Sequence, residues 1–258
     1  MSATVGSLAR GLALVLLSAG ALQLFFLGRV ALMAAVDPQS TAFQRSELWR
    51  LATHGSKWSW QQRWMPYERL APSLKRAVVA SEDAGFTEHS GVEWDAIEKA
   101  WERNQKLEAD AAKRDAEATR REPRPGVRPP APARPARVVG GSTISQQLAK
   151  NLFLGGERSL ARKGQEVVIT WFLEALLTKE RILEIYLNSV EWGEGVFGAE
   201  AAARHYFRVG ASALSSAQSA RLAVMLPAPK RFEKRPASPY LMGRAATVMA
   251  RMGAVDVP

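Results

Sequence analysis

The N-terminal end of the chain is a long apolar run, and no other feature of the sequence constrains the fold as strongly. Residues 12–28 read LALVLLSAGALQLFFLG and hold no charged side chain; Arg29 and a second apolar run, residues 30–36, follow. At 1.5 Å per helical residue the first run spans roughly 25 Å, and both together exceed the ~30 Å hydrocarbon core of a bilayer. Arg29 would extend its guanidinium toward a headgroup layer. We therefore expect a transmembrane signal-anchor helix at residues 12–36.

The charges around this helix predict its orientation. Arg10 precedes it and no acidic residue does, which favours a cytoplasmic tail at residues 1–11 and export of the rest of the chain. A cleaved signal peptide is the alternative, but the apolar run is long for one and no clear small-x-small cleavage site follows it. A buried core helix is disfavoured at the extreme N-terminus.

Length and composition narrow the class of the remaining chain. The 258 residues, 47% of them hydrophobic, suffice for one domain with a substantial core. A net charge of +10 favours an acidic partner: nucleic acid, anionic lipid or a phosphate-bearing substrate. The absence of cysteine excludes a disulfide scaffold, a thiolate zinc site and a cysteine nucleophile. Nucleic acid is the weakest partner, because the positive charge is spread out and the anchor would export the domain away from DNA.

Patterns beyond the anchor predict a mainly helical protein. Residues 37–63 form a juxtamembrane segment whose tryptophan and basic side chains suit either a membrane interface or packing against the domain. Apolar residues then recur every three or four positions over most of residues 64–258, and only residues 231–236 suggest a short strand. A Pro/Arg-rich insertion at about 105–137 interrupts this domain; it cannot pack a core and is read as a spacer or as a basic loop along the membrane.

Residues 81–91, SEDAGFTEHSG, form the first stretch that could carry chemistry. If a helix continues through it, Glu82, Phe86 and His89 share one face. An apolar ring beside a carboxylate raises the pKa of that carboxylate by desolvation, and Asp83 or His89 could orient it. The alternative is a solvated acidic pair in which Asp83 caps a neighbouring helix.

The second stretch is GGSTISQQLAKN, residues 140–151. Thr143 and Gln146 have the spacing of a capping box, which predicts a helix start whose free N–H groups favour an anion. Ser142, Gln146 and Lys150 form a polar stripe that ends in a cation, although such a stripe commonly just faces water. Two glycines, a cap and a lysine together indicate a phosphate site, but the P-loop pattern GxxxxGK[ST] is absent.

The third stretch, RKGQE at residues 162–166, places Arg162 and Lys163 within helical reach of Glu166. A surface salt bridge worth a few tenths of a kcal/mol is one interpretation. The other is a carboxylate held beside two cations that bind a diphosphate. Pairing would keep Glu166 ionised, whereas Glu82 would take up a proton more readily.

The fourth stretch, residues 184–207, contains three glycines in a loop between two helical patterns. Asn188 and Trp192 stand at the entrance of this loop. A structural turn is the favoured interpretation for most of these residues.

Together these stretches resemble the motifs of glycosyltransferase family 51, the peptidoglycan glycosyltransferases. The first motif of that family reads E-D-x-x-F-x-x-H-x-G, and its fixed positions are matched by Glu82, Asp83, Phe86, His89 and Gly91. The other stretches resemble the second to fourth motifs, and RLAVMLPAPKRFEKRP resembles the fifth, with Phe232 where a tyrosine is common. The match runs from about residue 64 to 252. Since no S-x-x-K motif occurs, a transpeptidase domain is not expected, and the chain is similar to monofunctional members.

The resemblance implies a lysozyme-like, mainly α domain with a smaller membrane-facing lobe. It implies lipid II and the growing glycan chain as substrates. Glu82 is matched to the general base that takes the proton of an acceptor hydroxyl, so that direct attack inverts the anomer to a β-1,4 bond and releases undecaprenyl diphosphate. The insertion falls where this family tends to have a mobile loop near the donor site, and its length is expected to affect access or processivity.

The resemblance also assigns the remaining site residues and the location. Glu166 is expected in the catalytic set, ordering the cations or holding a divalent ion, Mg²⁺ or Mn²⁺. The residues expected to bind substrate or diphosphate are Asp83, Phe86, His89, Ser142, Thr143, Gln146, Gln147, Lys150, Asn151, Arg162, Lys163 and Asn188. The expected location is a bacterial inner membrane, with a single span and a periplasmic catalytic domain. The expected partners are the membrane and proteins of cell-wall synthesis or division.

Two rival functions fit parts of the same pattern. A lysozyme-like hydrolase or lytic transglycosylase would also use one glutamate, but it has no diphosphate to stabilise, so the cations of the second and third stretches disfavour it. A catalytically silent cell-wall scaffold would not need Glu82 and Glu166. Both carboxylates are present, which favours an enzyme.

Overall fold

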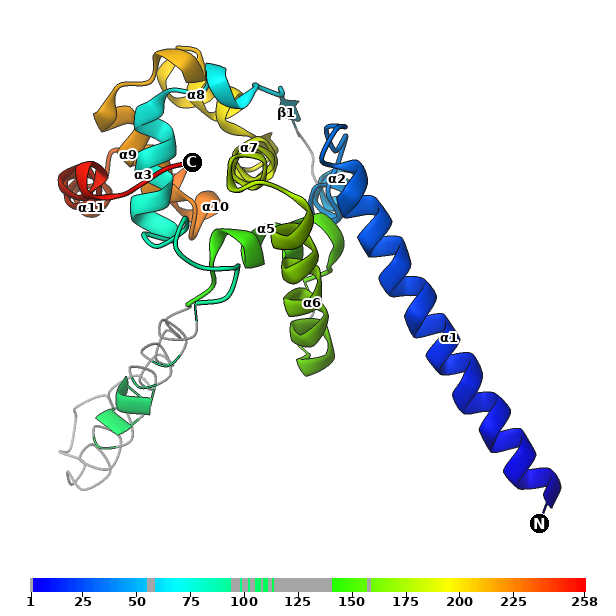
Figure 1. The fold of residues 1–258 in the computed structure, drawn as a ribbon. Coiled ribbons are helices and arrows are strands. Elements are labelled where there is room, and N and C mark those ends of the chain that lie inside the picture. The colour runs from blue at the N-terminus through cyan, green and yellow to red at the C-terminus, as the bar shows by residue number, and fades with distance from the viewer. Residues whose placement is uncertain are drawn as a thin grey trace. The chain divides into compact units, whose positions relative to one another are not determined.

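The computed structural model describes residues 2–54, 59–93, 141–156 and 159–258, together with positions 98, 102, 105–107, 109, 110 and 113. The chain divides into two compact units, one made of residues 1–92 and 143–258 and the other of residues 93–142. Most of the insertion predicted at 105–137 lies outside the described residues. The first unit is mostly helical, as the sequence predicts (Figure 1).

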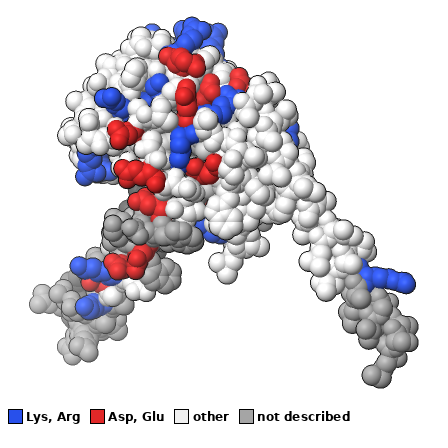
Figure 2. Space-filling view, viewed as in Figure 1, with Lys and Arg blue, Asp and Glu red and all other residues white. Residues whose placement is uncertain are grey.

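The first helix, α1 (Ser2–Leu32), contains the apolar run. Its residues Arg10–Leu32 are long and apolar enough to cross a membrane, which fits a single anchor near the N-terminus. Figure 2 shows most of its described surface uncharged, whereas acidic and basic side chains intermingle over the domain that follows. In the part of α1 whose side chains are described, the C-terminal end joins the core of the domain, through the buried side chains of Phe26 and Val30 and, just beyond the helix, Met33.

Two further contacts join α1 to the domain. The side-chain amides of Gln23 and Gln165 donate to each other, at 2.8 and 3.0 Å. The ring of Phe26 meets that of Phe153 edge to face, with 5.3 Å between centroids. The apolar helix is therefore packed against the same helices that carry the second and third sequence stretches.

The remaining elements follow in a helical array. The helices are α2 (Ala42–His54), η1 (Tyr67–Arg69), α3 (Pro72–Glu82), α5 (Ile144–Phe153), α6 (Leu160–Leu176), α7 (Lys179–Ser189), α8 (Ala199–Phe207), η2 (Ala211–Ala213), α9 (Ser216–Met225), α10 (Pro229–Phe232), α11 (Pro239–Arg251) and η3 (Met252–Ala254). Contacts between α3, α9 and α11 form one side of the core, and contacts between α5, α6 and α7 form another. Among the described residues, Trp192, Tyr186, Phe86 and Phe197 are the largest side chains that are fully buried.

A small sheet lies beside these helices. Its strands are β1 (Gln61–Gln62), β2 (Glu191–Gly193) and β3 (Val196–Phe197), in the order β1-β3-β2, with β3 parallel to β1 and antiparallel to β2. The strand suggested for residues 231–236 is wrong, because Pro229 opens the short helix α10 and turns follow it.

Local sequence explains where several helices begin. Pro72 and Pro239 occupy the first turn of α3 and α11, where a missing N–H leaves no bond unmade. Thr143 and Gln146 form the predicted capping box at the start of α5, and Ser215 begins a second one at α9. The start of α5 matters most, since this helix carries much of the candidate site.

Candidate active site

The first stretch is a turn rather than a continued helix. Helix α3 ends at Glu82, Asp83 is its C-terminal cap, and turns and bends occupy residues 84–91. The expectation that Glu82, Phe86 and His89 share a helix face is therefore wrong. Phe86 is fully buried, and its ring lies edge-on to that of His89 at 6.4 Å between centroids.

Asp83 and His89 hold this turn against the start of α5. His89 Nε2 lies 2.8 Å from one carboxylate oxygen of Asp83, and the backbone N–H of Ile144 donates to the other at 2.9 Å. The backbone N–H of Gly91 donates to His89 Nδ1 at 3.0 Å, so the ring proton belongs on Nε2, which donates to Asp83. Asp83 thus caps a neighbouring helix, as one alternative held, but it is buried rather than solvated.

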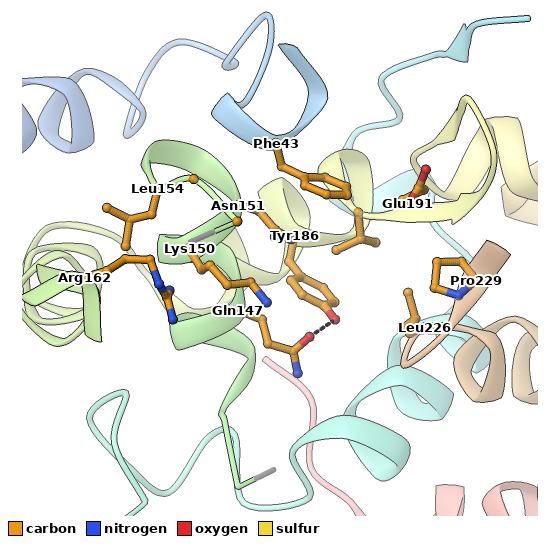
Figure 3. A pocket seen from close by; sticks show the side chains of 13 residues that line it. Phe43, Gln147, Lys150, Asn151, Leu154, Arg162, Tyr186, Glu191, Leu226 and Pro229 are labelled. Carbon is orange, nitrogen blue, oxygen red and sulfur yellow. Dashed lines mark hydrogen bonds between the residues drawn. The ribbon is translucent and has the colours of Figure 1, made fainter. Parts of the chain in front are cut away.

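Among the described residues, the hydrogen-bond donors to Glu82, the last residue of α3, are uncharged. Gln147 Nε2 donates to Glu82 Oε2 at 3.0 Å, and Ser81 also bonds this carboxylate. The Tyr186 hydroxyl donates to Gln147 Oε1 at 2.9 Å (Figure 3). This bond leaves the amide nitrogen of Gln147 to donate to Glu82. Burial raises the pKa of Glu82, while the two hydrogen bonds lower it and the charge of Asp83 raises it further.

A cleft of about 410 Å³ lies beside this carboxylate. Its wall is built by Phe43, Gln147, Lys150, Asn151, Leu154, Gly155, Gly156, Arg162, Tyr186, Val190, Glu191, Leu226 and Pro229. Figure 3 shows Arg162 and Leu154 at one end of the cleft and Pro229 and Leu226 at the other, with Tyr186 between them. Because Gln147 and Tyr186 are wall residues, Glu82 lies one hydrogen bond behind the wall.

A cluster of cations surrounds Glu166 at one end of this cleft. Arg162 Nη1 lies 3.0 Å from one oxygen of Glu166 and Lys163 Nζ 2.5 Å from the other, which confirms both predicted pairs. Glu166 itself is buried. Arg162 Nε is buried and, among the described residues, has no hydrogen-bond acceptor. The cluster therefore holds a donor that an anion in the cleft could satisfy.

Lys150 adds a third cation. Desolvation lowers the pKa of its ammonium, Glu166 raises it, and Arg162 and Lys163 lower it. In the described part of the chain no carboxylate lies within ion-pair distance of Lys150 Nζ. Lys150 follows Gln147 by three positions on α5, so the two are neighbours on one helix face.

The surroundings of Glu166 do not fit a divalent ion, which is one of the two roles that the resemblance implies for this residue. Both carboxylate oxygens already accept from cations, Arg162 and Lys163. The positive charge of Lys150 also interacts with the carboxylate of Glu166. A Mg²⁺ or Mn²⁺ ion needs several free oxygen ligands, and both oxygens of this carboxylate are already engaged.

Three other predicted residues have structural partners. Gln146 is buried and completes the capping box, so it does not form the predicted polar stripe with Ser142 and Lys150. Thr143 donates to the carbonyl of Gly91 at 2.6 Å. The amide of Asn188 bonds both the N–H and the carbonyl of Met65, at 2.8 and 2.9 Å, which supports its structural interpretation. Ser142 lies in the second unit, and its role stays a prediction.

Sequence reasoning missed two polar side chains of the cleft wall, those of Tyr186 and Glu191. Tyr186 looked like an ordinary core position of a helical pattern, and nothing local indicates that its hydroxyl orients Gln147. Glu191 follows α7 in a stretch interpreted as a turn. It is 8% exposed, and burial raises its pKa to about 7, against the lowering effect of Lys230.

Comparison with known proteins gives a consistent result. The sequence model of a family described as "Transglycosylase" matches residues 51–113 and 132–253. A biosynthetic peptidoglycan transglycosylase of Burkholderia thailandensis is 51% identical over 238 residues, which are 92% of this chain and 82% of that protein. One of Paraburkholderia xenovorans, with the same description, is 49% identical over 92% of this chain and 88% of its own length.

Proposed function

Because this chain belongs to the transglycosylase family, we propose that it polymerises lipid II into β-1,4-linked glycan strands and releases undecaprenyl diphosphate. The relatives that it matches are described as biosynthetic peptidoglycan transglycosylases, and the family is one of glycosyltransferases. One observation carries the finer proposal. A glutamate with a raised pKa lies one hydrogen bond behind the wall of a cleft that also carries a cation cluster.

Glu82 acts as the general base in this proposal. It takes the proton of the acceptor 4-hydroxyl while that oxygen attacks C1 of the donor sugar, and the bond from C1 to the diphosphate breaks with its electron pair leaving on the diphosphate. Direct attack converts an α linkage into a β linkage. Burial favours the protonated product state of Glu82, and the Gln147 hydrogen bond supports the ionised state that starts the step.

The cations act on the departing diphosphate. Negative charge grows on the leaving oxygen as the bond breaks, and fixed positive groups in a partly dry cleft stabilise that charge. Among the described residues, Lys150 offers an ammonium that no carboxylate pairs with, and Arg162 offers a buried N–H that has no acceptor. Glu166 holds Arg162 and Lys163 in place rather than taking part in proton transfer.

A lipid-linked substrate accounts for the apolar helix. If α1 spans the inner membrane with a cytoplasmic N-terminus, enzyme and substrate share one membrane plane and the catalytic domain lies in the periplasm. Helix α1 also packs against α5 and α6, which carry Lys150 and Arg162. Proteins of cell-wall synthesis or division could associate with the same assembly.

Polymerisation of labelled lipid II in detergent tests the proposal. The full-length protein is expected to make strands that lysozyme digests, whereas Glu82→Gln, which keeps the size but cannot accept a proton, makes none. Glu88→Gln removes an exposed carboxylate from the same turn and should polymerise normally.

Two outcomes would contradict the proposal. Equal strand formation by wild type and Glu82→Gln would remove Glu82 from the role of base. Release of soluble sugars from finished cell wall, without polymerisation, would identify a hydrolase or lytic transglycosylase instead.

A further inference from the structure

An ion pair outside the four sequence stretches supports the turn that follows Glu82. Lys179 Nζ donates to the carbonyl of His89 at 2.6 Å and lies 2.9 Å from Glu174 Oε1. The same ammonium stands 4.6 Å from the centroid of the Phe86 ring. The side chain of Lys179 is 21% exposed and that of Glu174 is 9% exposed, so water competes little with these contacts. One cation thus contacts two residues of the turn at once.

Glu174 links this pair to α5. Its Oε1 accepts a hydrogen bond from Ser145 Oγ at 2.5 Å as well as from Lys179. The turn also fits closely against α6 at Gly91, which has a φ of +85°. A Cβ atom at this position would lie 2.6 Å from Thr170 Cγ2 and 2.7 Å from Glu174 Cγ. Only glycine combines this backbone conformation with so close an approach.

The contacts continue from this ion pair to the candidate base. Lys179 fixes the carbonyl of His89, and the ring of His89 donates to Asp83. Asp83 follows Glu82 directly and caps α3. A shift of the His89 backbone would therefore move the partner of Asp83, and with it the end of the helix that carries Glu82.

We propose that Glu174 and Lys179 are positioning residues, which hold the turn of residues 83–91 so that Asp83 and His89 keep Glu82 in its reactive place. Neither residue lines the cleft, so both act through others. The inference rests on the proposed role of Glu82 as base. The tautomer of His89 distinguishes a positioning role from a purely structural one. If the ion pair of Glu174 and Lys179 only stabilised the fold, its loss would leave that tautomer and the turnover of folded protein unchanged.

Kinetics of the full-length protein in detergent form the first test. Lys179→Met keeps the aliphatic stem but removes the donors, and kcat is expected to fall about 10- to 100-fold while KM for lipid II stays within about threefold. Lys179→Arg, which can still pair with Glu174, should recover part of kcat. Arg204→Met is the matched control, because it removes the partner of another buried carboxylate, Glu200, in α8. It should retain kcat per folded molecule.

Nitrogen NMR of the imidazoles tests the same idea without substrate. The chain has only three histidines, so selective ¹⁵N labelling gives few signals. We expect His89 of the wild type to be the Nε2–H tautomer and Lys179→Met to show a mixture, with Arg204→Met unchanged. This readout does not depend on whether lipid II is the substrate, so failure of the proposed function and failure of this inference are distinguishable.

The results that would overturn the inference are specific. Wild-type kcat and an unchanged His89 tautomer in Lys179→Met would do so, as would an equal loss of kcat in Arg204→Met. Should Lys179→Met not fold, Ser145→Ala removes one hydrogen bond of Glu174 and serves instead. A kcat decrease of about three- to tenfold would support the inference, and unchanged kcat and tautomer would contradict it.

Discussion

Glu82 and Glu166 are the same amino acid in opposite surroundings. The donors to Glu82 are uncharged, from Gln147 and Ser81, and burial raises its pKa. The donors to Glu166 are two cations, each on a different oxygen. The first carboxylate is suited to take up a proton, and the second is suited to fix positive charge. Their neighbours, rather than the residue type, assign the two tasks.

After the complete loss of polymerisation expected for Glu82→Gln, the largest effect should come from Lys150, the cation that Glu166 does not bind directly. Lys150→Met removes the free ammonium from the cleft, and kcat/KM for lipid II is expected to fall about 100- to 1,000-fold because a charge-stabilising donor is lost. Initial rates of polymerisation measure this. Lys234→Met removes an exposed lysine elsewhere and should have no effect. Activity of Lys150→Met within twofold of wild type would leave the cation cluster without its proposed role.

Glu191 is a third carboxylate for this comparison. Burial raises its pKa, although Lys230 Nζ lies 3.4 Å from its Oε1. Among the described residues, this oxygen accepts no hydrogen bond. The pKa of Glu191 is about 7 in the folded protein, above the ordinary 4.5. The unfolded chain therefore loses this proton first, and the free energy of unfolding falls as pH rises from about 4.5 to about 7 and stays low at higher pH. Glu191→Gln should remove this loss, which amounts to about 3 kcal/mol at pH 8 and little at pH 4.5.

Thermal unfolding in detergent at the two pH values measures the effect of Glu191→Gln. The charged groups that act on Glu191 are Lys230, Glu47 and Glu233, and none of them is altered. The exposed Glu88→Gln serves as the control, with no difference between the two pH values. A variant of Glu191 that unfolds at a lower temperature than wild type at pH 8 would show that its ionised form stabilises the fold.

The smallest effect concerns the hydrogen bond that favours ionised Glu82. Gln147→Leu removes it, so the pKa of Glu82 should rise further and the acidic limb of the pH–rate profile should move to higher pH. At neutral pH kcat is expected to fall about tenfold and to recover toward alkaline pH. A profile that keeps its shape while dropping at every pH would mean that Gln147 acts on the substrate rather than on Glu82.

Local signals in the sequence predicted much of the fold. The apolar run of α1, the capping box of Thr143 and Gln146 and the helical spacing of Arg162 and Glu166 all lie within short segments, and the structure contains each of them. The continued helix through residues 81–89 was wrong for a different reason.

Contacts between distant segments decide the shape of that turn. Asp83 bonds Ile144, 61 positions along the chain, and Lys179 bonds His89 across 90 positions. No periodicity within residues 81–91 records such partners. Tyr186 and Glu174 were missed for the same reason, because their roles appear only once α5, α6 and α7 are packed together.

Helix α1 contributes Phe26 and Val30 to the same core as helices α5 and α6. If α1 spans a membrane, the side toward lipid needs only to be apolar, whereas the side toward the domain needs a particular shape. Exchanging this segment for an unrelated membrane helix would amount to a core substitution. The segment that would tether this protein to a membrane is therefore also part of its folded core.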